Sequence, residues 1–260
     1  MNVTVFGLGE AGSRLAGDLA GLGGPVAGYD PAAVPTPKGV ERFADPVGAV
    51  FGADVVFAVT AQSDAVAALQ QGLHAMRPGT LYADLSTSAP AVKQQLAKTA
   101  AQHSLDFADV ALMAPTRGLR TPSLVAGSGA ARYVALMGPL GVPVESVGDR
   151  AGDAATRKLL RSVMMKGLAA LVIEAMRAAE VAGLTPWLWG NLVDEITEAD
   201  EALLARLVRG TGPHAVRRLH EMEACLAMLE SLGIDPVMTR ATVENLRRIP
   251  AEGVPQLPAP

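Results

Sequence analysis

Three glycines near the start of the chain have the spacing that binds a nucleotide pyrophosphate. Gly7, Gly9 and Gly12 follow the strand-like run 2–6 and precede an amphipathic segment. Glycine at these positions permits a tight strand-to-helix turn, close approach of the backbone to phosphate, and close packing of the helix on the strand. A helix opening near Glu10 would offer unpaired N–H groups to the phosphates. The motif alone is weak in a chain with 27 glycines, but in this context it predicts a dinucleotide site over Gly7-Leu8-Gly9-Glu10-Ala11-Gly12.

Asp30 ends the next strand-like run, at the distance where a dinucleotide-binding unit carries an acidic residue. A carboxylate there accepts hydrogen bonds from the ribose hydroxyls and repels a 2′-phosphate, so we expect NAD, with NADP disfavoured. Pro31 follows, and the nearest downstream cations are Lys38 and Arg42, so no guanidinium is expected beside Asp30. The alternative is an exposed aspartate at the end of a strand.

Polar residues also follow two later strand-like runs. Ser86 and Thr87 come directly after the run 80–85, at the end of a strand where open α/β sheets bind ligands. Thr60, Ala61 and Gln62 occupy the equivalent place after the preceding strand and are expected to flank the nicotinamide ribose. For Ser86 or Thr87 the alternative is an ordinary helix cap.

Elements that could hold these residues alternate along the first half of the chain. Short apolar runs at 54–60, 80–85, 105–111 and 124–127 follow the first unit, with helical or turn segments between them, as a doubly wound parallel sheet requires. Residues 153–182 lack proline and strand alternation and predict a long apolar helix that must be buried, either in a second domain or against another subunit; Gly183 ends it. Further helices are expected at 186–209, 213–231 and 236–248.

The predicted fold class is therefore α/β, a Rossmann-type doubly wound sheet followed by an all-α C-terminal domain. The expected boundaries are 1–150 for the dinucleotide-binding domain, 151–250 for the helical domain that binds substrate and dimerises, and 251–260 for a flexible tail.

Composition excludes several classes of protein. The net charge of −4 argues against nucleic acid as a partner, and the apolar stretches are interrupted before they reach membrane-spanning length. Cys225 is the single cysteine, which excludes an internal disulfide and most cysteine metal sites, so no metal is expected. The chain enters a strand at once, without the core of a signal peptide, so the cytoplasm is the expected location.

Four segments together resemble the β-hydroxyacid dehydrogenases, the family that contains 3-hydroxyisobutyrate dehydrogenase and 6-phosphogluconate dehydrogenase. They are the glycine loop, the run Asp84-Leu85-Ser86-Thr87-Ser88-Ala89-Pro90, Asp109 at the start of a substrate loop, and Gly152 followed six residues later by Lys158. Glu174 and Ala182-Gly183 continue the register of the family's central helix. The resemblance is strongest over residues 1–183, and the stretch 217–223 looks more like a branch with a distinct C-terminal domain.

The resemblance implies that Lys158 is the general acid/base that takes the proton of the substrate hydroxyl. Such a base needs a pKa near the working pH, and the neighbouring cations Arg157 and Arg161 disfavour a third positive charge. Lys166 is the rival, but it lies eight positions further, about 12 Å along a helix. The alternative for Lys158 is an exposed lysine at a helix start.

The chain departs from the family where the substrate binds. Met113-Ala114-Pro115 replaces the usual Ser-Gly-Gly turn and removes two hydrogen-bond donors, which Arg117 and Arg120 could replace by binding an anion. Where the family usually has an asparagine three residues past the base, this chain has Arg161, with Ser162 next. Where the family usually has a lysine in its second domain, this chain has Met222. The nearby basic residues, which include His214 and Arg218, suggest a small anionic substrate with a second anionic group; a solvated or inter-subunit face is the alternative.

The predicted function is hydride transfer between NAD(P) and a β-hydroxy acid or a related small anionic hydroxy compound, in a homodimer. Relatives that reduce imines share the architecture but replace the family lysine, so Lys158 argues against that reading. A dinucleotide-binding protein without turnover is a third possibility.

Overall fold

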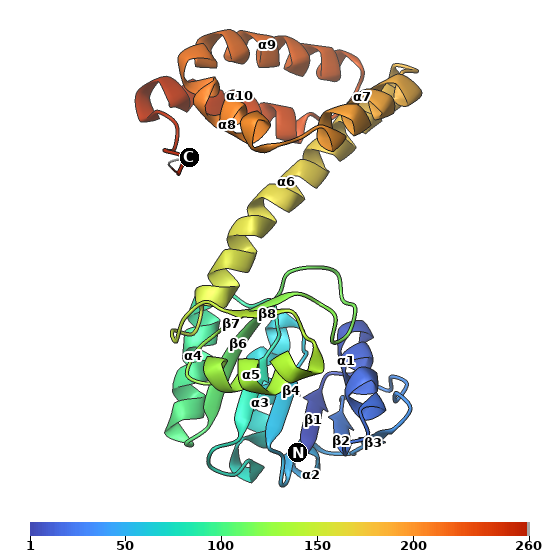
Figure 1. The fold of residues 1–260 in the computed structure, drawn as a ribbon. Coiled ribbons are helices and arrows are strands. Elements are labelled where there is room, and N and C mark those ends of the chain that lie inside the picture. Colours follow the sequence, from blue (N-terminus) through green and yellow to red (C-terminus); the bar gives the residue numbers. More distant parts are fainter. Residues whose placement is uncertain (259–260) are drawn as a thin grey trace. The chain divides into compact units, whose positions relative to one another are not determined.

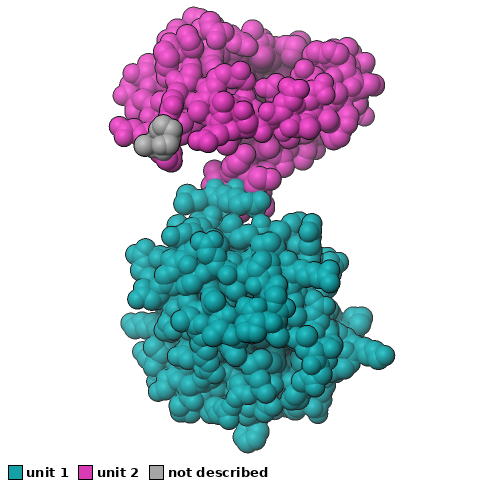
Figure 2. Space-filling model, in the orientation of Figure 1, with its two compact units in different colours: residues 1–161 teal, residues 162–260 magenta. Residues whose placement is uncertain are grey.

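The computed structural model describes residues 1–258. The chain divides into two compact units, residues 1–161 and residues 162–260 (Figure 2). Each unit is described by itself.

The first unit is built on one eight-stranded sheet (Figure 1). The strand order is β3-β2-β1-β4-β5-β6-β7-β8. The chain builds the sheet outward in one direction from β1 to β3 and in the other from β4 onward, as in a doubly wound fold. The strands are β1 (Val3–Phe6), β2 (Val26–Tyr29), β3 (Val40–Arg42), β4 (Val55–Ala58), β5 (Leu81–Asp84), β6 (Asp106–Leu112), β7 (Ser123–Ala126) and β8 (Val144–Ser146). The predicted fold class is confirmed, with one exception to the parallel sheet. β7 runs antiparallel to β6, because the connection 113–122 contains no helix that could carry a parallel crossover.

Helices cover both faces of this sheet. They are α1 (Glu10–Gly21), α2 (Pro46–Val50), α3 (Ala65–Gly72), α4 (Pro90–Gln102) and α5 (Ala130–Met137), with short 3-10 turns at Gln62–Asp64, Leu73–Ala75 and Gly138–Leu140. One apolar core joins the sheet to α1 and α5 through residues such as Leu15 and Tyr133, and the other joins it to α2, α3 and α4 through residues such as Leu69 and Leu96. Burial on both faces explains why the central strands are continuous apolar runs rather than alternating ones.

Two strands, β3 and β8, were not predicted. Each has three residues and forms one edge of the sheet. Such short edge strands carry too few buried positions to produce a recognisable apolar pattern.

The second unit is helical. α6 (Asp153–Val181) begins in the first unit and continues into the second, where α7 (Thr185–Thr197), α8 (Glu201–Arg209), α9 (Thr211–Ser231) and α10 (Val237–Glu252) follow. Gly183, with a φ of +70°, follows the end of α6 as predicted. No helix among residues 1–258 is both long enough and apolar enough to cross a bilayer.

Two predicted helix boundaries in this unit are wrong. The single helix expected over 186–209 is interrupted at 198–200, where the Asp200 side chain accepts a hydrogen bond from the Leu203 N–H and caps α8. The last helix runs to Glu252 rather than 248, because Pro250 lies in the final turn, where the Gly253 N–H still bonds to the Ile249 carbonyl. Residues 251–252, expected in the tail, are therefore helical, and residues 259–260 lie outside the described part of the chain.

A carboxylate joins two helices of the second unit. Glu174 of α6 is buried and accepts hydrogen bonds from the N–H groups of Met238 (2.7 Å) and Thr239 (2.8 Å) and from the Thr239 hydroxyl (2.7 Å). Burial alone would raise the pKa of Glu174, but these three hydrogen bonds and the nearby charge of Arg240 outweigh it, and the pKa lies below its ordinary value. Glu174 thus stabilises the start of α10 in its ionised form.

Candidate active site

Two glycines of the glycine loop allow close packing within the chain, and the third borders open space before α1. Gly7 has a φ of +85°, and a Cβ there would lie 2.3 Å from the Val59 carbonyl oxygen. A Cβ on Gly12 would lie 1.8 Å from the Gly7 oxygen, so the helix could not pack this closely on the strand with a larger residue. A Cβ on Gly9 would meet nothing within 4 Å. Gly7 and Gly12 are required by the chain itself, whereas Gly9 faces open space.

The start of α1 carries donors without acceptors. The N–H groups of Glu10, Ala11 and Gly12 donate to no described residue, and Gly9 provides no side-chain cap. These groups carry the partial positive charge of a helix N-terminus, which suits an anion.

Asp30 is held beside this loop. One carboxylate oxygen accepts from the Leu8 N–H (2.7 Å) and the other from the Ala32 N–H (2.8 Å). The side chain is partly buried, so the alternative of a merely exposed aspartate does not describe it.

A cleft of about 430 Å³ runs along these residues. Five of the predicted cofactor residues line it, namely Gly7, Gly9, Asp30, Thr60 and Ala61. The Thr60 hydroxyl oxygen is buried and has no hydrogen-bond partner among the described residues. Open space at Gly9, unpaired helix donors and this orphaned hydroxyl all fit a bound dinucleotide.

The other predicted cofactor residues do not line the cleft; they are Leu8, Glu10, Ala11, Gly12, Gln62 and Ser86. Leu8 is buried and contributes its N–H to Asp30. The cleft instead includes Tyr29 and Pro31, which flank Asp30, and Asp64 and Gln71, which precede and occupy α3. These residues were not predicted; the signal for Asp64 and Gln71 is their position at the start and on one face of the helix that follows β4.

The expectation that no guanidinium lies beside Asp30 is wrong. Arg42 donates to the main-chain oxygens of Val34 (2.6 Å), Asp30 (2.8 Å) and Ala32 (2.6 Å). The cause is the pairing of β2 with β3, which places Arg42 opposite Gly28, two residues before Asp30.

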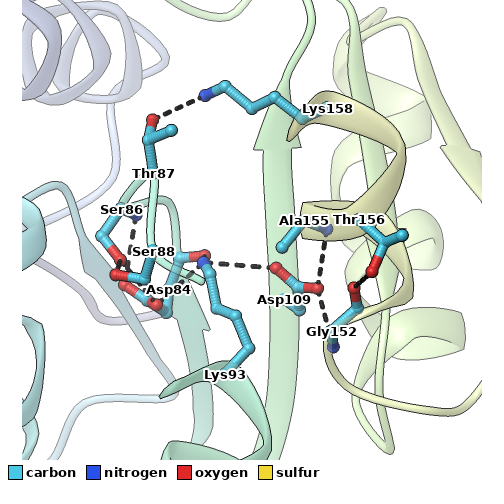
Figure 3. Close-up of polar contacts among 10 residues, drawn as sticks. All are labelled: Asp84, Ser86, Thr87, Ser88, Lys93, Asp109, Gly152, Ala155, Thr156 and Lys158. Carbon is cyan, nitrogen blue, oxygen red and sulfur yellow. Dashed lines mark hydrogen bonds and ion pairs between the residues drawn. The ribbon is translucent and has the colours of Figure 1, made fainter. Parts of the chain in front are cut away.

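Lys158 and Thr87 meet at the carboxyl end of β5. The Lys158 Nζ donates to the Thr87 Oγ1 at 2.8 Å (Figure 3). Lys158 is partly buried in the second turn of α6, and Thr87 is exposed after the end of the strand. Lys166, the rival base, is exposed and belongs to the second unit.

Ser86 does not cap a helix. Its hydroxyl donates to an Asp84 carboxylate oxygen (2.9 Å) and lies 2.8 Å from the Ser88 hydroxyl. The N-cap of α4 is Ala89, which has no side-chain cap, so neither Ser86 nor Thr87 has the alternative role considered above.

The loop 113–122 is attached to α1. Arg14 donates to the Thr116 carbonyl (2.9 Å), and the Leu119 N–H donates to Asp18 (2.9 Å). Met113 is half-buried and its N–H bonds to the Pro122 carbonyl. The guanidinium groups of Arg117 and Arg120 are exposed and form no ion pair with any described carboxylate.

Three further predicted substrate residues, Ser162, His214 and Arg218, belong to the second unit. Arg218 donates to the Thr211 hydroxyl and lines a cavity of about 600 Å³ together with Arg217 and Met222. His214 is exposed and does not line this cavity.

Comparison with known proteins assigns the family. Residues 2–139, more than half of the chain, match the family described as the NAD binding domain of 6-phosphogluconate dehydrogenase. The chain belongs to this family. Residues 179–249 match a second family, described as a domain of unknown function (DUF1932). The predicted resemblance, including the distinct C-terminal domain, is confirmed.

Relatives of this 6-phosphogluconate dehydrogenase-type chain are distant. A 2-(hydroxymethyl)glutarate dehydrogenase from Eubacterium barkeri is 23% identical over 221 residues, covering 80% of this chain and 73% of that protein. An uncharacterized 28.5 kDa protein from Methanothermus fervidus is 26% identical over 169 residues, which cover 65% of this chain and 66% of that protein. A reductive aminase from Aspergillus terreus, solved in complex with NADPH and ethyl levulinate, has the same fold, with a TM-score of 0.79 at 19% identity over 97% of this chain and 94% of that one. The first unit is thus an NAD(P)-binding domain of an oxidoreductase architecture.

Proposed function

We propose that this protein transfers a hydride between NAD and a β-hydroxy acid, with Lys158 as general acid/base. The observation that carries the proposal is the hydrogen bond from the Lys158 Nζ to the Thr87 Oγ1 at the carboxyl end of β5. In open α/β sheets, ligands bind at this edge. The 2-(hydroxymethyl)glutarate dehydrogenase relative supports the substrate class, since the compound in its name carries a hydroxymethyl group and two carboxylates.

The chemistry divides between cofactor and protein. A dinucleotide held in the cleft along Gly7, Gly9 and Asp30 would supply the acceptor for the hydride on the carbon that carries the hydroxyl group. Lys158 in its neutral form takes the hydroxyl proton, and Thr87 orients the amine by accepting a hydrogen bond from one of its N–H groups. A second proton acceptor is not required, because oxidation of an alcohol releases one hydride and one proton.

Exposed arginines supply candidate contacts for the acid. Arg117 and Arg120 of the loop 113–122 have no carboxylate partner among the described residues, and a guanidinium binds a carboxylate with two parallel hydrogen bonds. This assignment replaces the donors lost with the Ser-Gly-Gly turn.

Two assays test the proposal. In the first, a panel of hydroxy acids, including dicarboxylic and phosphorylated ones, is incubated with NAD or NADP, and reduced cofactor is followed by absorbance. In the second, NADPH is incubated with a ketone and an amine, and its oxidation is followed in the same way. We expect NADH formation with at least one β-hydroxy acid that carries a second anionic group. NADPH oxidation with a ketone and an amine, with no hydroxy acid oxidised, would contradict the proposal.

That second outcome corresponds to an imine-reducing enzyme of the same architecture. Met113 and Pro115 favour it, because they remove donors that would hold a substrate carboxylate. The lysine at position 158 argues for the hydroxy acid.

We also propose that the protein is a homodimer through its second unit. Side chains of α6 that were expected to be buried are exposed in the single chain, among them Val163 (75%), Met164 (54%) and Ile173 (51%). Trp187 and Trp189 of α7 are exposed as well. Apolar patches of this kind are typical of protein interfaces.

A further inference from the structure

A buried lysine outside the proposed reaction connects two parts of the site. Lys93 of α4 has a side chain 1% exposed. Its Nζ lies 2.8 Å from an Asp84 carboxylate oxygen, 2.9 Å from the Asp84 main-chain oxygen and 3.2 Å from an Asp109 carboxylate oxygen. Both carboxylates are as buried as the lysine, so one ammonium is shared by two acidic groups.

Asp109 connects Lys93 to the helix that carries Lys158. Its second oxygen accepts from the N–H groups of Gly152 (3.0 Å) and Ala155 (3.1 Å), at the start of α6 (Figure 3). The positive end of the helix supplies further compensation for the carboxylate. Ala155 lies one helical turn before Lys158. By binding the Ala155 N–H, Asp109 therefore fixes the position of the helical turn that carries Lys158.

Asp84 connects Lys93 to Thr87. Its carboxylate accepts from the Ser86 hydroxyl (2.9 Å) and from the Ser86 N–H (3.2 Å). These bonds hold the segment after β5, and Thr87 is the next residue. The supports of Lys158 and of its hydroxyl partner therefore meet at the Nζ of Lys93.

We propose that Lys93 is a positioning residue that sets the contact between Lys158 and Thr87. Buried ion pairs contribute little net stability compared with an apolar pair of similar volume. Removal of the ammonium leaves two buried carboxylates to repel each other, which moves the start of α6 and the segment after β5 independently. The significance of this contact for catalysis rests on the proposed function, but the contact itself can be tested without substrate.

The test measures the rate at which an amine-reactive acylating reagent labels Lys158, by mass spectrometry at one fixed pH. Thr87→Val removes a hydrogen bond to the ammonium form and is expected to speed labelling about fivefold. In a Lys93→Met background the same Thr87→Val change should alter the rate by less than about twofold, because the contact is already lost. Lys166, which is exposed, is the internal reference in each digest.

A matched control separates positioning from general destabilisation. Leu96→Ala removes a buried side chain from α4, one turn after Lys93, and should lower the melting temperature while keeping the fivefold effect of Thr87→Val. If that effect also persists in folded Lys93→Met, the proposal is overturned.

If Lys93→Met does not fold, Asp109→Asn replaces it in the same cycle. This variant keeps the side-chain shape and removes the charge that pairs with Lys93, and it should reduce the effect of Thr87→Val to less than about twofold. Persistence of the fivefold effect in folded Asp109→Asn overturns the proposal. A wild-type protein that oxidises no hydroxy acid would contradict the proposed function only. The labelling rates would still decide whether Lys93 positions Lys158 against Thr87, because that measurement uses no substrate.

Discussion

At the residue scale, two opposite charges border the segment between β2 and β3, because Asp30 directly follows β2 and Arg42 ends β3. The Asp30 carboxylate lines the cleft and bonds to the glycine loop, whereas the Arg42 guanidinium is occupied by three main-chain carbonyls of the same segment. A carboxylate repels the 2′-phosphate of NADP, and a guanidinium attracts it. Because Asp30 faces the cleft and Arg42 is already engaged, we expect the carboxylate to decide the preference in favour of NAD.

Asp30→Asn tests this balance. The amide keeps an acceptor for the Leu8 N–H and removes the charge, so the affinity for NADPH relative to NADH should rise about tenfold, equivalent to about 1.4 kcal/mol. Fluorescence titration of both reduced cofactors gives the two dissociation constants. Glu41→Gln, an equal charge change on the exposed face of β3, should leave the ratio within about twofold. An unchanged ratio in Asp30→Asn would assign the preference to other groups.

Residues whose roles depend on near neighbours could be predicted from sequence. Gly7 and Gly12 belong to such a local motif, and the structure gives both the close contacts that the motif requires. Arg42 and Lys93 could not be predicted. Strand pairing brings Arg42 to Asp30, and a lysine in an amphipathic helix gives no sign that its partners are the ends of β5 and β6.

At the element scale, α10 depends on an ionised carboxylate from α6. The pKa of Glu174 is lowered from its ordinary value of 4.5, so its contribution to stability is complete above that pH and is lost as the pH falls through the folded-state pKa. Glu174→Gln should lower the unfolding free energy of the helical unit by about 1–2 kcal/mol at pH 7. The difference from wild type should shrink below about pH 4, as the wild-type carboxyl becomes protonated.

Tryptophan fluorescence during urea unfolding measures this effect selectively, because Trp187 and Trp189 both lie in α7 of the second unit. Glu180→Gln on the exposed face of α6 is the control and should change stability by less than about 0.5 kcal/mol. A Glu174→Gln deficit that stays constant down to pH 3 would show that the ionised form of Glu174 is not the source of the stability.

Element types were predicted better than element ends. The long run without proline predicted α6 and its end at Gly183, because both signals are strong and local. The interruption at 198–200 was missed, since the acidic residues there are compatible with a helix until Asp200 caps the next one. β3 and β8 were missed because three residues at an edge contain too little pattern.

At the scale of the whole molecule, the exposed apolar face of α6 predicts association. Sedimentation should give a particle of about twice the chain mass of 26.8 kDa. Val163→Glu, at a side chain 75% exposed, should shift the particle toward the single-chain mass, because a charge would be buried in the interface. Lys98→Glu on α4 is the charge-reversal control and should leave the mass unchanged. A wild-type protein that sediments at 26.8 kDa would contradict the dimer.

Removal of the Lys158 amine tests the proposed reaction itself. In Lys158→Met, NADH formation from the best hydroxy acid should fall by about 10²- to 10⁴-fold, the usual contribution of a general acid/base. The dissociation constant for NADH should stay within about twofold of wild type, because the cleft along the glycine loop does not include position 158. Turnover by Lys158→Met at the wild-type rate would show that Lys158 is not the general acid/base.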